Sequence, residues 1–179
     1  MKFYTADLHL GHKNVLGLSK RPFLNVYDMR ETILNNWNKI VSNSDDVYVL
    51  GDIGFDFDDI IDFLMNANGN IHLLPGNHDK FYNRLKTSLQ KPVYKKLSKR
   101  LMLHDDIHNI KDNGYHISLC HFPIYEWHQY HRGSVHLHGH THGNIGESYK
   151  KNAYDVGVDV RSFKPVNLND ILINKKNVN

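Results

Sequence analysis

Three histidines alternate with small residues in the segment 138–142, which has the sequence His-Gly-His-Thr-His. On an extended chain, residues two apart point to the same side, so we expect His140 and His142 to reach one point together. Two imidazole nitrogens that converge on one point are common ligands of transition metals. The segment therefore predicts part of a metal site.

Four other apolar runs also end in residues that bind metals or move protons. These runs, each with the residues that follow it, are 1–6 with Asp7 and His9, 47–50 with Asp52, 71–75 with Asn77, His78 and Asp79, and 117–120 with His121. In open α/β sheets, ligands bind beyond the carboxyl ends of strands, where loops from several strands converge. We therefore expect distant parts of the chain to build one site.

The donor atoms in this set are carboxylate and amide oxygens and imidazole nitrogens, with no thiolate. This mixture suits Mn, Fe, Zn, Ni or Co better than a cysteine-rich zinc site would. Two carboxylates, one amide and four imidazoles are too many for one ion. They suffice for two ions that share a bridging carboxylate and keep open positions for water and substrate.

The order of these blocks, Asp-x-His, Gly-Asp, Gly-Asn-His-Asp, His and Gly-His-Thr-His, resembles the calcineurin-like metallophosphoesterase superfamily. The segments 7–14, 21–23 (Arg-Pro-Phe) and 37–38 (Trp-Asn) are similar to those of its compact bacterial and phage-type members. The resemblance runs from residue 3 to about Pro165. It implies an α/β fold of two facing mixed β-sheets flanked by helices, arranged as a four-layer sandwich.

The resemblance also implies a role for each residue of the set. Asp7, His9 and His142 would hold the first metal ion, Asn77, His121 and His140 the second, and Asp52 would bridge both. His78 would face the substrate as a general acid or phosphate stabiliser, and Asp79 would orient it. Every position is filled, which argues against the metal-free scaffold members of the superfamily. The cofactors expected are two divalent ions, Mn first, with Fe, Zn, Ni or Co as alternatives.

This pattern predicts dinuclear-metal-dependent hydrolysis of phosphate esters, above all phosphodiesters, by a hydroxide held between the two ions. We expect no covalent intermediate, because no Ser or Cys occupies an obvious nucleophile position. The alternatives are a phosphomonoesterase or a nuclease with the same metal core, or a non-catalytic metal-binding interaction module. The expected partner is a phosphate-ester substrate, with nucleotides and nucleic acids among the candidates and no membrane. The sequence leaves the oligomeric state open.

Two further residues are candidates for substrate binding. His12 either touches the substrate phosphate or caps the segment that follows it, since it lies only three residues past His9. Arg21 either clamps a phosphate oxygen through its planar guanidinium or is a loop charge anchored by Pro22. For Arg21 we favour the functional interpretation, because its segment belongs to the resemblance.

Several other polar residues have a structural interpretation that competes with a functional one. The basic run of Lys91, Lys95, Lys96, Lys99 and Arg100 is typical of a solvated face, although beside the site it would favour a polyanion. The aromatic segment 125–131 would stack a base or pack as a lid. His136 and His138 are expected to be structural, and the segment 155–159 to support the site without ligating metal.

Composition and length describe an ordinary globular chain. Its 179 residues, with 40% apolar and 23% charged residues, predict a single domain over 1–179 with a frayed polar tail from about residue 174. No apolar run approaches transmembrane length, and no signal peptide is expected. Cys120 is the only cysteine, which excludes an internal disulfide and leans toward a cytoplasmic location. The net charge of +3 is too small to argue for nucleic acid by itself.

Hydrophobic patterning supplies the elements that must position the site. Apolar runs predict strands at about 2–6, 47–50, 71–74, 115–120, 135–139 and 153–158. Apolar residues at helical spacing predict helices over 28–41 and 58–66, with a weaker one over 79–89. The alternation of strands and helices in the first half indicates an α/β fold.

Overall fold

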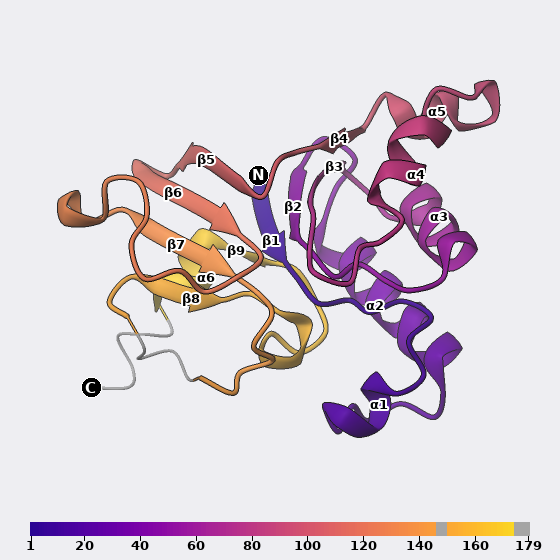
Figure 1. Cartoon of the computed structure of the whole chain (residues 1–179), viewed down its shortest axis with the longest axis horizontal. Helices are drawn as coiled ribbons and strands as arrows, with labels where there is room; N and C mark the ends of the chain where they lie inside the picture. The colour runs from indigo at the N-terminus through magenta and orange to yellow at the C-terminus, as the bar shows by residue number, and fades with distance from the viewer. Residues whose placement is uncertain (146–149, 174–179) are drawn as a thin grey trace.

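The computed structural model describes residues 1–145 and 150–173, and the expected tail from about 174 lies outside this range. The described residues form two sheets (Figure 1). The first has the order β4-β3-β2-β1-β9, with β1 Lys2–Thr5, β2 Asp46–Leu50, β3 Asn70–Leu74, β4 Leu101–Leu103 and β9 Val166–Asn167. The second has the order β5-β6-β7-β8, with β5 Ile107–Asp112, β6 Tyr115–Cys120, β7 Val135–His138 and β8 Ala153–Asp155. Both sheets are mixed, because β9 runs antiparallel to β1 and β5 runs antiparallel to β6.

The helices are α1 Val15–Leu18, α2 Val26–Ile40, α3 Phe57–Asn66, α4 Tyr82–Ser88, α5 Lys95–Ser98 and α6 Leu168–Ile173, with 3-10 turns at Pro92–Tyr94, Tyr130–Arg132 and Val158–Val160. The two longest begin at side-chain caps. The side chain of Asn25 accepts a hydrogen bond from the amide of Asp28 at 2.9 Å, and Asp56 caps α3 in the same way. None of the helices in the described part of the chain combines the length and apolarity needed to cross a bilayer.

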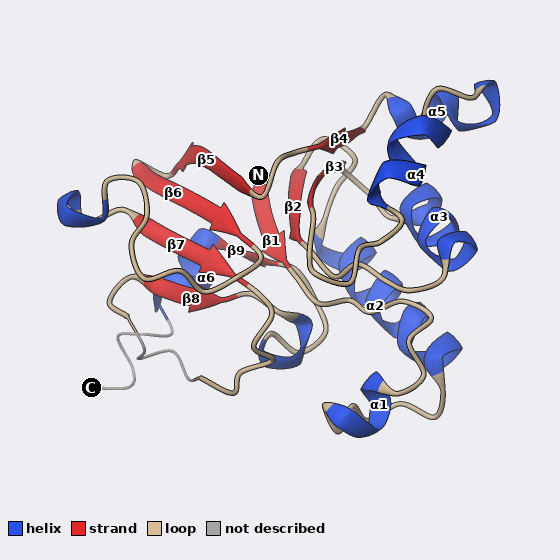
Figure 2. Cartoon of the chain, viewed as in Figure 1, coloured by secondary structure: helices blue, strands red, loops and turns tan. Residues whose placement is uncertain are grey.

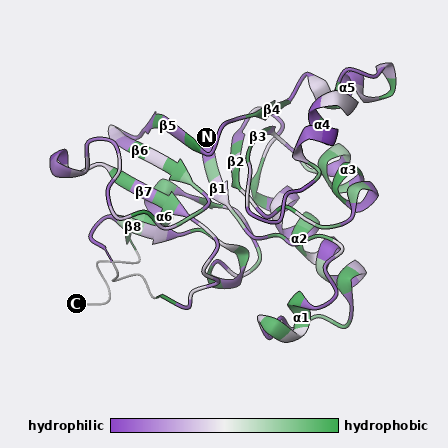
Figure 3. Cartoon of the chain, in the orientation of Figure 1, coloured by the Kyte–Doolittle hydropathy of each residue, from purple (hydrophilic) through white to green (hydrophobic). Residues whose placement is uncertain are grey.

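The first sheet lies between a helical layer and the second sheet. Alternate residues of β2 point to opposite faces, so Val47 and Val49 pack with the helices while Tyr48 and Leu50 pack toward the second sheet. Figure 1 shows α2, α3 and α4 on the side of the first sheet away from β5–β8. Helix α3 presents both hydrophobic and hydrophilic residues, as a helix with one buried face does (Figure 3). The α/β architecture of two mixed sheets flanked by helices is therefore confirmed.

Most of the expected elements are present, with shifted ends. The expected strand over 153–158 ends at Asp155, because the chain turns at Gly157 into a 3-10 turn. The weak helix expected over 79–89 begins at Tyr82, because Asp79 is engaged by the amides of neighbouring loops. The patterns did not predict β4, β5, β9, α1, α5 or α6. Cys120 is a buried free thiol at the end of β6.

The topology brings the ends of many strands together. Strands β1, β2 and β3 are parallel, and so are β6, β7 and β8, so that each set has its carboxyl ends on one edge of its sheet. An isolated bridge between Ala6 and Gly157 joins the end of β1 to the segment after β8. The arrowheads of β1, β6 and β7 in Figure 2 point toward the same central region. The residues that follow these strands therefore meet between the two sheets.

Candidate metal centre

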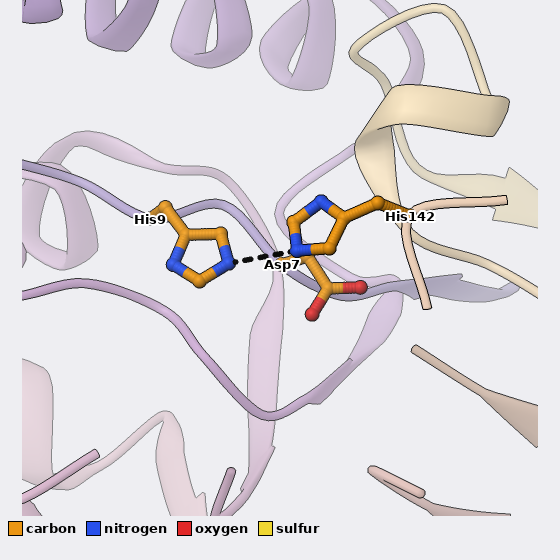
Figure 4. Close-up of side chains that lie close together, drawn as sticks. All are labelled: Asp7, His9 and His142. Atoms are coloured by element: carbon orange, nitrogen blue, oxygen red, sulfur yellow. Dashed lines mark hydrogen bonds between the residues drawn. The ribbon is translucent and has the colours of Figure 1, made fainter. Parts of the chain in front are cut away.

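Two groups of potential ligands lie between the sheets. In the first, one ligand atom each from Asp7, His9 and His142 lie within 4.8 Å of one another (Figure 4). The two Nε2 atoms of His9 and His142 face each other at 3.3 Å. In the second group, atoms of Asp7, Asp52 and His121 meet the same limit, so the buried carboxylate of Asp7 belongs to both.

The remaining predicted ligands extend the second group toward solvent. The Oδ1 atom of Asn77 lies 2.9 Å from His121 Nε2 and 3.0 Å from His140 Nδ1. The Oδ2 atom of Asp52 lies 3.5 Å from His121 Nε2 and 3.9 Å from His9 Nε2. Asp52 is thus the carboxylate that lies between an imidazole of the first group and an imidazole of the second. All seven predicted ligands lie in two adjacent groups.

The expectation that His140 and His142 reach one point is wrong. Strand β7 ends at His138, and both later histidines lie in a turn with positive φ, at 70° and 48°. Their rings diverge, so that His140 faces Asn77 while His142 faces His9. The two-residue period applies to extended backbone and fails once the chain turns.

Left-handed backbone is concentrated at this site. Positive φ values between 48° and 70° occur at Asp7, His9, Asp52, His140 and His142. Such conformations are sparsely populated for residues other than glycine, and the surrounding fold must hold them in place. Five of the predicted ligands adopt this conformation. The fold thus holds them in an unfavourable backbone conformation, as expected where the direction of the side chains matters for a site.

Two glycines let the backbone approach the carboxylates closely. A Cβ atom at Gly76 would lie 2.2 Å from Asp52 Oδ1, and one at Gly139 would lie 2.6 Å from Asp7 Oδ2. Real Cβ atoms do not approach polar atoms this closely. The glycines beside Asn77 and His140 are therefore required by packing against the two carboxylates.

Hydrogen bonds fix which ring nitrogen can act as a ligand in two of the imidazoles. His121 Nδ1 lies 2.8 Å from the carbonyl oxygen of Leu50, to which it donates, so its Nε2 keeps a lone pair toward Asp52 and Asn77. His142 Nδ1 lies 2.6 Å from Asp159 Oδ2, which leaves its Nε2 toward His9. Metal-ligating histidines typically hold their second nitrogen in this way.

Asp159 is in turn held by Arg21. The guanidinium donates to Asp159 at 2.8 Å and 2.7 Å, and also to the carbonyl oxygens of Asp7 at 2.7 Å and Leu8 at 3.0 Å. Burial would raise the pKa of Asp159, but the hydrogen bonds from His142 and Arg21 outweigh it and lower that pKa. The hydrogen bond to Asp159 raises the pKa of His142.

These contacts correct the expectation that Arg21 clamps a phosphate oxygen. Its side chain is fully buried, and its donors are occupied by the protein. Arg21 positions the first ligand group instead. Sequence patterns cannot pair residues 138 positions apart, although the acidic ends of the segment 155–159 were expected to support the site. Asp155 does so through its Oδ2, which accepts from Thr141 Oγ1 at 2.8 Å and the Gly143 amide at 3.0 Å.

Asp79 does not orient the His78 ring, contrary to expectation. Its carboxylate accepts from the amides of Gly76 at 2.7 Å, Asp52 at 2.8 Å and Ile53 at 3.1 Å. Burial raises the pKa of Asp79 to about 6. Asp79 therefore ties the loop after β2 to the loop after β3. His78 donates its own amide to Asp52 Oδ1 at 2.9 Å, and its exposed ring is free to face a ligand.

The electrostatics of the inner residues suit a cation. Burial raises the pKa of Asp7 well above its usual range. Burial lowers the pKa of His9 to about 2 and also lowers that of His121, so both rings are neutral and carry lone pairs. A divalent ion would supply the positive charge that a buried carboxylate lacks and would accept these lone pairs. The donor set therefore fits divalent metal.

Two hollows open beside this centre. One of about 430 Å³ is lined by His9, His12, His78 and His142 together with Ser19 and Lys20. The other, of about 500 Å³, is lined by the segment 55–58, by His78, Lys80 and Phe81, and by Arg84 of α4. His12 thus lies on a wall of the first hollow, so contact with substrate remains one of its two interpretations. Its ring stacks on Phe55 with centroids 4.0 Å apart.

The basic run 91–100 lies away from the metal centre, and part of the aromatic segment 125–131 lies in the core. Helix α5, which contains Lys95 and Lys96 of the basic run, directly precedes β4 and so lies at the amino edge of the first sheet, opposite the site (Figure 1). Arg100 of this run turns inward and donates to the carbonyl oxygens of Ala67 and Gly69. Trp127 is buried against His136, with ring centroids 5.1 Å apart, so this part of the aromatic segment packs on the second sheet.

The chain has similar sequences among curated proteins, although no family model matches it. It is 31% identical to the uncharacterized protein MJ1445 of Methanocaldococcus jannaschii, over 96% of this chain and 88% of that protein. It is 27% identical to the gene 66 protein of Mycobacterium phage D29, over 90% of this chain and 88% of the phage protein.

A solved structure shares the fold. Protein AQ665 of Aquifex aeolicus, a protein of unknown function, superposes with a TM-score of 0.73 and 24% identity over 98% of both chains. The phosphoesterase YfcE of E. coli gives a TM-score of 0.40 and 13% identity, over 87% of this chain and 77% of that one. The first match supports the fold, and the second is too loose to carry an argument.

Proposed function

The chain belongs to the same family as protein MJ1445 of Methanocaldococcus jannaschii, and we propose that it hydrolyses phosphodiesters with two divalent metal ions. The observation that carries this proposal is the position of Asp52. Its Oδ2 atom lies 3.5 Å from His121 Nε2 and 3.9 Å from His9 Nε2, so this one carboxylate faces an imidazole of each proposed ligand set and could be shared between them. The order of the ligand blocks, which resembles the calcineurin-like metallophosphoesterases, supports the same conclusion.

The proposed ligand sets divide the residues of the two groups and their neighbours Asn77 and His140 as the resemblance implies. Asp7, His9 and His142 would hold one ion, Asn77, His121 and His140 the other, and Asp52 both. Mn(II) is the first candidate for both positions. Formal counting gives two divalent cations against two carboxylates, which leaves a positive site for an anionic ester. Four carboxylates would have cancelled that charge, whereas neutral imidazole and amide ligands preserve it.

The ions, when bound, would activate water and stabilise negative charge on the phosphate oxygens. The chain itself must orient the ester and supply a proton to the leaving oxygen. His78 is placed for this, because its ring is exposed in both hollows while its amide is anchored to Asp52. A general acid so placed contributes about 10²–10⁴-fold to rate. Asp79 fixes the backbone around His78 by accepting hydrogen bonds from the amides of Asp52, in the loop after β2, and Gly76, in the loop after β3.

The test is metal-dependent turnover of two matched esters. Protein stripped with a chelator and reloaded with Mn(II) should cleave bis-p-nitrophenyl phosphate faster than p-nitrophenyl phosphate, and the stripped protein should cleave neither. Preference for the monoester would contradict the phosphodiesterase proposal and favour a phosphatase with the same core.

A His78→Ala variant separates an enzyme from a module that holds metal for structure alone. The variant should bind Mn(II) like the unaltered protein and lose turnover, because His78 is not among the proposed ligands. His131→Ala is a matched control, since His131 is also an exposed histidine but lies in the 3-10 turn Tyr130–Arg132. Equal turnover in both variants would contradict the role given to His78.

A further inference from the structure

The hollow of about 500 Å³ beside the metal centre has walls unlike those of its neighbour. It is lined by three phenylalanines and four charged residues together with His78, namely Phe55, Phe57, Phe81, Asp56, Asp58, Lys80 and Arg84. Its volume falls within the range of small-molecule sites. None of these residues belongs to the proposed ligand set, so the metal ions do not account for this composition.

Flat surfaces dominate this hollow. Phe55 is 45% exposed, and its ring lies 5.1 Å from the His78 ring, which is the one side chain shared by both hollows. The guanidinium of Arg84 lies 3.9 Å from the centre of the Phe57 ring, so that phenylalanine already holds it in place. Exposed aromatic faces and a planar guanidinium are the surfaces on which nucleobases stack.

The charges of the hollow argue against a second phosphate group there. Lys80 and Arg84 are balanced by Asp56 and Asp58, which makes the hollow formally neutral. The neighbouring hollow instead combines Lys20 with the proposed ion ligands His9 and His142, and it is the electropositive one once ions are bound. A phosphate belongs in the electropositive hollow, and an uncharged planar ring with polar edges belongs in the neutral one.

We propose that the hollow formed by residues 55–58 and 80–84 is a nucleobase subsite, and that Phe55 and Arg84 select a nucleoside phosphodiester as the substrate. This inference rests on the proposed function. Phe55 lies next to the first hollow, because its ring also stacks on His12, which lines that hollow, at 4.0 Å. A ring stacked on Phe55 would place its attached phosphate beside His78.

The test compares two ligands that differ only in the base. Calorimetry on the Mn(II)-loaded protein should show AMP binding at least about fivefold tighter than ribose 5-phosphate, which is the lower end of the value of one base stack. Phe55→Leu keeps an apolar side chain but removes the flat face, so it should abolish this ratio. Phe55→Tyr should preserve it. Arg84→Met should reduce it.

Phe122→Leu is the matched control. Phe122 is 43% exposed, packs on His121 and His140, and does not line this hollow. It should keep the AMP ratio. Equal binding of the two ligands by the unaltered protein, an unchanged ratio in Phe55→Leu, or loss of the ratio in Phe122→Leu alone would overturn the subsite.

Turnover of bis-p-nitrophenyl phosphate by the same preparations separates this failure from that of the proposed function. Metal-dependent turnover with equal binding of AMP and ribose 5-phosphate refutes only the subsite. A preserved AMP ratio without any turnover refutes the hydrolase and leaves a nucleotide-binding site.

Discussion

The contact between Asp159 and His142 gives a sharp prediction about metal affinity. Arg21 donates to both carboxylate oxygens of Asp159, through Nε to Oδ1 at 2.8 Å and Nη2 to Oδ2 at 2.7 Å, while His142 Nδ1 lies 2.6 Å from Oδ2. In Asp159→Asn only one of these oxygens remains. If that oxygen stays with Arg21 Nε, the amide NH₂ faces His142 Nδ1, and the ring must carry its proton on Nε2.

That tautomer removes the lone pair that His142 directs toward His9, and the opposite orientation of the amide replaces the charged acceptor of the Nδ1 proton with a weaker, neutral one. Loss of such a supporting partner typically lowers metal affinity about 10–100-fold, or about 1.4–2.8 kcal/mol. Equilibrium titration of the stripped variant and the stripped unaltered protein with Mn(II) measures this difference in affinity directly. Breaking the buried pair with Arg21 should also cost about 3 kcal/mol of unfolding free energy, measured with urea.

Arg21→Met separates these two effects. It breaks the same buried pair and should lower stability by a similar amount, but it leaves the Asp159 carboxylate against His142. Its Mn(II) affinity should therefore fall less than that of Asp159→Asn. An unchanged affinity in Asp159→Asn, or equal losses in both variants, would refute the role assigned to Asp159.

Three further predictions concern stability and packing. His136 is fully buried, and its pKa is lowered to about 4, chiefly by burial. Because the unfolded chain protonates this ring below about pH 6.5 and the folded one only near pH 4, the neutral ring's contribution to the free energy of unfolding is complete above pH 6.5 and is lost as pH falls toward 4. In urea unfolding of metal-free protein, the free energy of unfolding should therefore fall less between pH 7 and pH 5 in His136→Gln than in the unaltered protein. An equal fall in both would contradict this. Chelation should lower the melting temperature, since an ion at 100 times its Kd contributes about 2.7 kcal/mol; a chelator-insensitive transition would argue against ions in the fold. Gly139→Ala should weaken Mn(II) binding, because the new Cβ would lie 2.6 Å from Asp7 Oδ2. Gly17→Ala is the matched control, because Gly17 has open space around it and, like Gly139, no positive φ; equal Mn(II) affinities in the two variants would count against the packing argument.

The central strands and the composition of the site could be predicted because burial leaves a direct trace in the sequence. β2 and the end of β6 are buried on both faces, so they appear as continuous apolar runs with polar residues after them. β5 alternates between exposed and half-buried residues and has few apolar ones, so no run marks it. β4 and β9 have three and two residues, too few to show a pattern.

Side-chain directions at the site could not be predicted because they depend on turns and on distant partners. His140 and His142 diverge through left-handed backbone, which the two-residue period does not anticipate. Arg21 was assigned to substrate because its Arg-Pro-Phe segment belongs to the resemblance and a planar guanidinium suits phosphate, but its partner Asp159 lies far along the chain. Asp79 was assigned to its neighbour His78, whereas its partners are backbone amides, which no residue type reveals.

The most direct test of the account is a titration of stripped protein with Mn(II), with bound metal and bis-p-nitrophenyl phosphate hydrolysis measured at each step. We predict that turnover rises until two ions are bound per chain, and that Asp52→Asn, which alters the carboxylate between His9 and His121, abolishes it. Two bound ions without turnover, or full turnover in Asp52→Asn, would contradict the dinuclear hydrolase.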